Sequence, residues 1–210
     1  MREMAIRHAH LLILLMNYEF TRDRMVHYSR TPWMIYPCLW KKYNGESEMT
    51  SIPAGYPNDQ IEAFSLLATR DRLSTDDMKI LALLEAAGET FYFAAADAVD
   101  NDEAKDLLRR NGQEERGHAH RLLKAIELLG EKFSLPADAD NPYIQPMDLD
   151  GIINADLLNI IRQSEQDGDL QYQAWADAEP NDAVAKILRQ NGAEETRHGE
   201  RVAQVVALLC

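Results

Sequence analysis

The chain has 210 residues, of which 46% are hydrophobic and 27% are charged, and its formal net charge is -13. This length and composition suit one globular domain with an appendage. The acidic excess repels polyanions, so we expect neither nucleic acid nor an anionic membrane surface as a partner.

Two cysteines, Cys38 and Cys210, stand far apart in the sequence. This pattern is neither a disulfide framework nor a paired CxxC metal site, and it favours a reducing compartment. The apolar run at residues 11–16 is too short to span a bilayer or to form a good signal-peptide core. We therefore expect a soluble, cytoplasmic protein.

Residues 1–73 are predicted to form an N-terminal helical extension. Residues 2–29 place apolar side chains near heptad spacing, and residues 59–73 have the pattern of a shorter amphipathic helix. Between them, residues 31–57 hold five tryptophans and tyrosines among four prolines, which indicates an aromatic-rich loop packed on the bundle or on a partner subunit. The apolar run at residues 11–16 could be buried within one chain or between the subunits of a homodimer.

Residues 74–130 are repeated as residues 154–210. A shift of 80 residues aligns the two segments without gaps, and 21 of the 57 aligned pairs are identical. Polar and glycine positions persist while many apolar positions differ, whereas a repeat kept only for packing should keep its apolar pattern. The repeat therefore points to a polar site that both copies retain.

Each repeat predicts a helical hairpin. Ser74 and Asn154 are good N-cap residues, and the helices that they begin run to about residues 99 and 179 before a short turn. So short a turn forces two antiparallel helices. Residues 131–151 contain three prolines and are long enough to cross from one end of a bundle to the other. Residues 74–210 therefore predict an all-α four-helix bundle made of two hairpins and one long crossover.

A Glu-x-x-His motif occurs once in each repeat, as Glu115 with His118 and as Glu195 with His198. The two side chains of each motif leave one helix face about one turn apart, so they can share a metal ion. If the first hairpin turns near residue 100, Glu85 on the partner helix lies level with its motif.

The second repeat gives the same register, with Glu165 level with its motif. Glu89 and Asp169 lie about 6 Å away along the helix axis. Glu85 and Glu165 are therefore the better ligand candidates, and Glu89 and Asp169 are alternatives or hydrogen-bonding neighbours.

The predicted core thus holds four carboxylates and two imidazoles: Glu85, Glu115, Glu165, Glu195, His118 and His198. Four buried carboxylates without cations are too costly to stay ionised, and two divalent cations would balance their charge. Mixed oxygen and nitrogen ligands suit iron or manganese, and the lack of thiolates argues against structural zinc. One such motif usually lies on a solvated face, but two copies at matching positions predict a metal site.

This pattern resembles the ferritin-like superfamily, and most closely its rubrerythrin-like di-iron carboxylate proteins, over residues 74–210. The resemblance implies that Glu115 and Glu195 bridge two metal ions. It also implies that each ion has one terminal carboxylate and one imidazole: Glu85 or Glu165, and His118 or His198.

Tyr92 and Tyr172 also match a family position. A helical tyrosine leans toward its own N-terminus, so each hydroxyl is either a hydrogen-bond partner of the carboxylates or an ordinary core hydroxyl. The arginines one turn beyond the histidines are expected to pair with acidic neighbours: Arg121 and Arg201 with Glu114 or Glu194. Four glycines lie almost level across the hairpins and favour close helix packing, the alternative being open space beside the metals: Gly88 with Gly112, and Gly168 with Gly192.

The resemblance implies a non-haem oxidoreductase with two iron ions, or manganese as the alternative, that reacts with peroxide or dioxygen. Rubrerythrins proper carry a rubredoxin module with paired CxxC motifs, and this sequence contains no CxxC. Electrons would therefore come from a separate donor. The competing hypothesis is a non-enzymatic protein that binds or stores iron or manganese.

Overall fold

The computed structural model describes residues 52–209. The predicted helix at residues 2–29 and most of the loop at residues 31–57 lie outside these described residues. Within them the chain forms five α-helices and no β-strand: α2 (Gln60–Ala68), α3 (Thr75–Asp97), α4 (Asp102–Leu128), α5 (Ala155–Ala178) and α6 (Asp182–Leu209).

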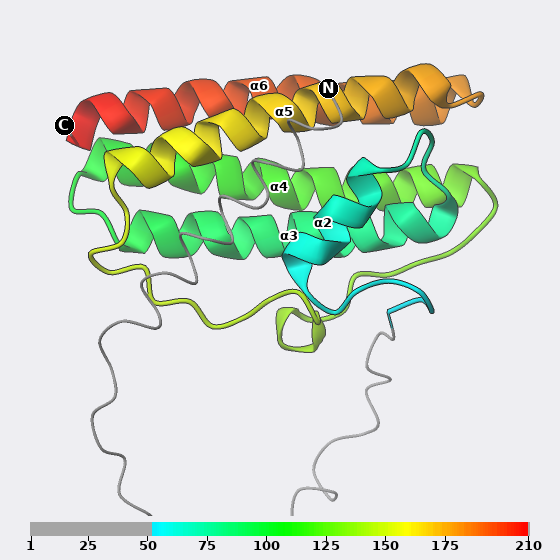
Figure 1. Cartoon of the computed structure of the whole chain (residues 1–210), viewed down its shortest axis with the longest axis horizontal. Helices are drawn as coiled ribbons and strands as arrows, with labels where there is room; N and C mark the ends of the chain where they lie inside the picture. The colour runs from blue at the N-terminus through cyan, green and yellow to red at the C-terminus, as the bar shows by residue number, and fades with distance from the viewer. Residues whose placement is uncertain (1–51, 210) are drawn as a thin grey trace, which may run out of the picture.

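The four long helices form a bundle of two hairpins. α3 packs along α4, α5 packs along α6, and the hairpins meet where α4 contacts α6. The connection between α4 and α5, which includes a short 3-10 helix at Asp138–Asp140, runs the length of the bundle (Figure 1). The predicted all-α, ferritin-like four-helix bundle with a long crossover is confirmed.

Polar side chains cap the four long helices, and Ser74 and Asn154 do so where the sequence predicts. The side chain of Ser74 accepts a hydrogen bond from the backbone N–H of Asp77, whose carboxylate accepts from the Ser74 N–H in return. Asn154 caps α5, and Asn101 and Asn181 cap the second helix of each hairpin. Each cap satisfies a backbone donor that the first helical turn leaves unpaired, which fixes where each helix begins.

Helix α2 is shorter than predicted: it ends at Ala68, not at residue 73. The Thr69 hydroxyl donates to the carbonyl of Leu66, and Arg70 turns away to donate from Nε to Asp77 Oδ1 at 3.0 Å. Tyr56, from the predicted aromatic loop, donates to the same carboxylate oxygen at 2.8 Å. These bonds tie the chain before and after α2 to the start of α3.

Two apolar clusters divide the bundle along its length. One contains Leu81, Leu122 and Leu188, and the other contains Leu108 and Leu158, all at most 2% exposed. The buried polar residues of α4 and α6 fall between these clusters in the sequence of each helix. The polar site is thus enclosed by apolar packing on both sides.

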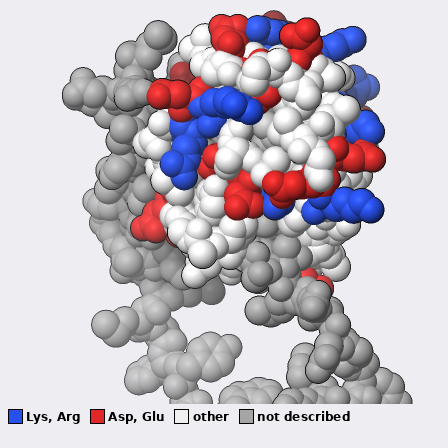
Figure 2. Space-filling view, turned by 90° about the vertical axis from the view of Figure 1, so that its right-hand side faces the viewer, with Lys and Arg blue, Asp and Glu red and all other residues white. Residues whose placement is uncertain are grey.

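Figure 2 views the bundle from the end that carries the α5–α6 turn. Acidic and basic side chains are intermixed on this face, so neither sign of charge forms a continuous patch there. Among the described residues, no helix is both long and apolar enough to cross a membrane.

Candidate metal centre

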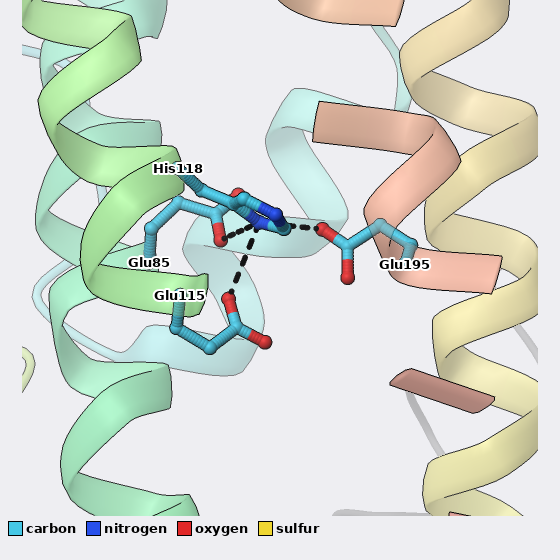
Figure 3. A group of neighbouring side chains, drawn as sticks. All are labelled: Glu85, Glu115, His118 and Glu195. Carbon is cyan, nitrogen blue, oxygen red and sulfur yellow. Dashed lines mark hydrogen bonds and ion pairs between the residues drawn. The ribbon is translucent and has the colours of Figure 1, made fainter. Parts of the chain in front are cut away.

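The structure brings all six predicted ligands together at the middle of the bundle. Their atoms form two overlapping groups, in each of which the possible ligand atoms lie within 4.8 Å of one another: Glu85, Glu115, His118 and Glu195, and then Glu115, Glu165, Glu195 and His198. Figure 3 shows the first group, in which three carboxylates converge on the ring of His118. Both groups contain Glu115 and Glu195.

These two shared carboxylates each lie between the two imidazoles. Glu115 places Oε1 at 3.2 Å from His198 Nδ1 and Oε2 at 3.6 Å from His118 Nδ1. Glu195 places Oε1 at 3.1 Å from His118 Nδ1 and Oε2 at 3.2 Å from His198 Nδ1. Each carboxylate therefore offers one oxygen to either side, as a ligand that bridges two cations must.

Glu85 and Glu165 each approach one imidazole only. Glu85 Oε2 lies 3.4 Å from His118 Nδ1, and Glu165 Oε2 lies 3.5 Å from His198 Nδ1. The register predicted from the helix rise is consistent with these distances. Glu89 instead pairs with Arg116, and Asp169 accepts from Thr196 Oγ1 at 2.6 Å, so neither belongs to the two groups.

The outer nitrogen of each histidine binds a carboxylate of the opposite repeat. His118 Nε2 lies 3.2 Å from Glu194 Oε2, and His198 Nε2 lies 3.2 Å from Glu114 Oε2. Because a carboxylate accepts, each Nε2 carries the proton, which leaves Nδ1 to face the central carboxylates. The residues next to the shared glutamates thus orient the imidazoles.

Arginines hold these outer carboxylates in place. Arg121 donates to Glu194, and Arg201 donates from Nη2 to Glu114 Oε1 at 2.8 Å. The predicted arginine–glutamate pairs are therefore present, and each joins α4 to α6. The contact between these glutamates and the histidines was not predicted, although its residues are among the identical pairs of the repeat.

Two buried asparagines complete the contact between α4 and α6. Asn111 Nδ2 donates to the backbone carbonyl of His198 at 3.2 Å, and Asn191 Nδ2 donates to that of His118 at 3.4 Å. Both side chains belong to residues with no exposed surface. They secure the backbone at each histidine, a role that only their identity in both repeats could have suggested.

The tyrosine hydroxyls also reach across the repeats. Tyr92 donates to Glu165, and Tyr172 donates to Glu85. Both tyrosines are at most 3% exposed, so the hydrogen bond of each buried hydroxyl is made to a carboxylate and not to bulk water. Of the two readings that the sequence allowed, the structure shows the hydrogen bond to a carboxylate of the site.

Burial and contacts between neighbouring residues shift the pKa values of the cluster in different directions. Burial, reinforced by neighbouring carboxylates, raises the pKa of Glu85 well above its usual range and that of Glu165 to about 8. Burial would also raise the pKa of Glu115, but its close contacts with the two histidines lower it well below the usual range. Burial alone would lower the pKa of His118, and the charge of Glu195 with the adjacent carboxylates raises it instead. The cluster therefore holds protons where no cation neutralises it.

The donor set fits two divalent cations. His198 Nδ1 is buried and makes no hydrogen bond within the described part of the chain, although it lies 3.2 Å from oxygens of both Glu115 and Glu195. A buried ring nitrogen that faces two carboxylates without a hydrogen bond to either is an unsatisfied polar atom, and a shared cation at this position would satisfy it. The set of carboxylate oxygens and imidazole nitrogens suits iron or manganese.

The glycines divide between the two predicted roles. A Cβ at Gly112 would lie 2.9 Å from the ring of Phe93, and one at Gly192 would lie 2.9 Å from Tyr172 Cβ, so these two allow close packing. Gly88 and Gly168 line a cavity that reaches the carboxylates. Open space beside the site is therefore present at one glycine of each pair.

A family model described as Rubrerythrin matches residues 82–206, which span all six candidate ligands. Comparison with curated proteins gave no match, and neither did comparison with solved structures.

Proposed function

This chain belongs to the rubrerythrin family, and we propose that it is a non-haem di-iron oxidoreductase that reacts with peroxide or dioxygen. The observation that carries the proposal is the placement of Glu115 and Glu195. In each of them, one carboxylate oxygen lies near His118 and the other lies near His198. A single-metal site would need only one such group of ligands. Manganese remains the alternative metal, since it favours the same donors.

In the proposed site, Glu115 and Glu195 would be shared by the two ions. Glu85 and His118 would hold one ion, and their counterparts Glu165 and His198 would hold the other. Four carboxylates and two divalent cations sum to zero charge, which makes the buried cluster tolerable. When bound, two ferrous ions would supply two electrons to an oxygen–oxygen bond within reach.

The protein's part is to position the ligands and to supply protons. The hydrogen bonds from Tyr92 and Tyr172 hold the terminal carboxylates on the side away from the imidazoles, and each hydroxyl can return a proton to its carboxylate oxygen. Glu114 and Glu194 keep the imidazoles in the orientation that presents Nδ1. Burial leaves Glu85, Glu115 and Glu195 each only 6% exposed, which limits their contact with bulk water.

Peroxide reduction is the reaction that we favour. Peroxide takes two electrons and two protons, its oxygen–oxygen bond breaks, and two water molecules form. An external donor must then return two electrons to the site, because this sequence contains no CxxC pair of its own. Dioxygen and peroxide are thus the proposed small-molecule partners, and a separate redox protein or cofactor is the proposed donor.

Anaerobic loading with ferrous iron, followed by rapid mixing with peroxide or with air-saturated buffer, tests the proposal. We expect oxidation of both ions at each turnover, faster with peroxide, and recovery of the ferrous state on addition of an artificial reductant. A Glu195→Gln variant, which lacks the charge of one shared carboxylate, serves as the control and should no longer oxidise two ions at each turnover. Continued iron uptake beyond two ions per chain, with growth of a ferric mineral, would instead establish the storage protein.

A further inference from the structure

A cavity of about 320 Å³ lies between α3 and α5, and residues of α2 line it as well. The main helix pairs in contact are α3 with α4, α5 with α6, α4 with α6 and, much less extensively, α2 with α3. The outer helices of the two hairpins, α3 and α5, are not such a pair. Among the described residues, α3 and α5 therefore leave room for the cavity between them.

The floor of the cavity is the candidate metal centre. Its lining includes all four carboxylates of the cluster and the two tyrosines that bind them, whereas neither His118 nor His198 lines it. A molecule in the cavity would thus meet the site on the face away from the imidazoles. Gly88 and Gly168 lie at this floor, and their lack of side chains leaves Glu115 and Glu195 uncovered.

The walls of the cavity differ in polarity. Above the carboxylate floor, the wall on α2 and α3 is mainly apolar and includes Phe64, Leu84 and Phe91, although α2 also contributes Gln60 and Ser65. The wall on α5 carries Ser164 and Gln171 at the repeat positions of Leu84 and Phe91. The cavity thus departs from the symmetry of the metal site, and it suits an apolar body that presents one hydrogen-bonding group to α5.

Size and charge narrow the class of molecule further. A water molecule takes about 30 Å³ of the liquid, and a dry apolar cavity of about 150 Å³ suffices to bind benzene. Peroxide or dioxygen alone would leave most of this volume unfilled. The described lining contains no lysine, arginine or histidine to neutralise an anion, and it does contain carboxylates.

We propose that the cavity is a binding site for a neutral, mainly apolar organic molecule of about 10 to 14 heavy atoms, held beside the metal centre. Binding itself requires only the cavity. The role of that molecule as a substrate of the metal centre rests on the function proposed above.

Calorimetric titration of the full 210-residue chain with 2-naphthol tests the inference, with 2-naphthoate as the anionic counterpart. We expect saturable binding of one 2-naphthol per chain. In the metal-free protein, 2-naphthoate should bind more weakly by about tenfold or more, because its charge faces the carboxylates. The experiment is done both on metal-free protein and on protein loaded anaerobically with ferrous iron.

Two variants should fill the cavity from opposite walls. Ser65→Phe acts from α2 and Gln171→Phe from α5, and each should weaken 2-naphthol binding by about tenfold or more. Gln171→Phe introduces the residue that already stands at the repeat position, Phe91, so it should fold even if the other variant does not. Leu170→Phe is the matched control, because Leu170 is 64% exposed and does not line the cavity.

Saturable binding that Gln171→Phe weakens and Leu170→Phe does not would support the inference. Absence of saturable binding would overturn it, as would equal binding by Gln171→Phe and the wild type. If the chain binds 2-naphthol but its ferrous form does not react with peroxide or dioxygen, the proposed function is contradicted and the proposed binding site is not. The reverse result would contradict the binding site alone.

Discussion

Gly88 and Gly168 occupy equivalent positions in the two repeats, but alanine should have different effects at each. A Cβ at Gly168 would lie 3.5 Å from Glu195 Cγ, which is ordinary van der Waals contact. A Cβ at Gly88 would lie 3.2 Å from Glu115 Cδ and 3.3 Å from its Oε2. The Glu115 carboxylate must then move by a few tenths of an ångström, although it is a proposed bridge.

These distances predict different changes in the free energy of unfolding for the two substitutions. Alanine in a helix interior is favoured over glycine by about 1 kcal/mol, so Gly168→Ala should stabilise the metal-free protein by about that amount. At Gly88 the same gain is offset by about 1 kcal/mol of side-chain strain, so Gly88→Ala should leave the stability nearly unchanged. Displacement of Glu115 should also weaken metal binding by about fivefold to tenfold, whereas Gly168→Ala should bind like the wild type.

Urea unfolding of the two metal-free variants measures the first quantity, and competition with a chelator for ferrous iron measures the second. Equal stabilisation by both substitutions, with equal metal affinity, would refute the close approach of Gly88 to Glu115. Loss of metal by Gly168→Ala alone would refute the assignment of the tighter contact to the first repeat.

Three further outcomes follow from the contacts described above. Glu194→Gln removes the charge that orients His118, so we expect ferrous iron affinity to fall by about tenfold to a hundredfold, and an unchanged chelator titration would contradict that role. Metal loading at pH 7 should release protons, because the raised pKa values of His118 and Glu165 mean that cations displace bound protons, so affinity should fall as pH falls; calorimetry in buffers of different ionisation enthalpy detects the release. Burial would raise the pKa of Asp77, but hydrogen bonds from Ser74, Tyr56 and Arg70 lower it. The ionised Asp77 carboxylate therefore stabilises the fold above its unfolded pKa of about 3.9, and this stabilisation is lost as pH falls through the lower folded pKa. Asp77→Asn should lower the free energy of unfolding by about 2 kcal/mol at pH 7 and make stability fall less steeply as pH falls below about 4. The same fall in stability at acid pH in the variant and the wild type, measured by urea unfolding, would contradict this prediction.

The register of each hairpin could be predicted because the rise of an α-helix is fixed. Counting from the turn places Glu85 level with Glu115 and His118, and places Glu89 about one turn away from them. In the structure Glu85 and Glu115 do lie close to His118, at 3.4 and 3.6 Å. Helix starts were equally predictable, because Ser74 and Asn154 act through bonds within three residues. These features depend on local geometry alone.

The contacts between the hairpins could not be predicted in this way. Sequence spacing says nothing about how α4 lies against α6, so it could not assign Glu194 to His118 or Tyr172 to Glu85. The end of α2 depends likewise on Asp77, which lies in another helix and draws Arg70 out of the helical path. The identity of these polar residues between the repeats was the available clue to the crossed contacts at the site.

The central claim is that the six residues hold two metal ions jointly, with Glu115 as a bridge. The most direct test is the stoichiometry of ferrous iron bound after anaerobic loading and gel filtration, in the wild type and in Glu115→Ala. We expect two ions per wild-type chain and a marked loss in the variant. The variant should nevertheless stay folded, because removal of one clustered carboxylate relieves repulsion in the metal-free state. Fewer than one ion per wild-type chain, or two ions at full occupancy in Glu115→Ala, would contradict it.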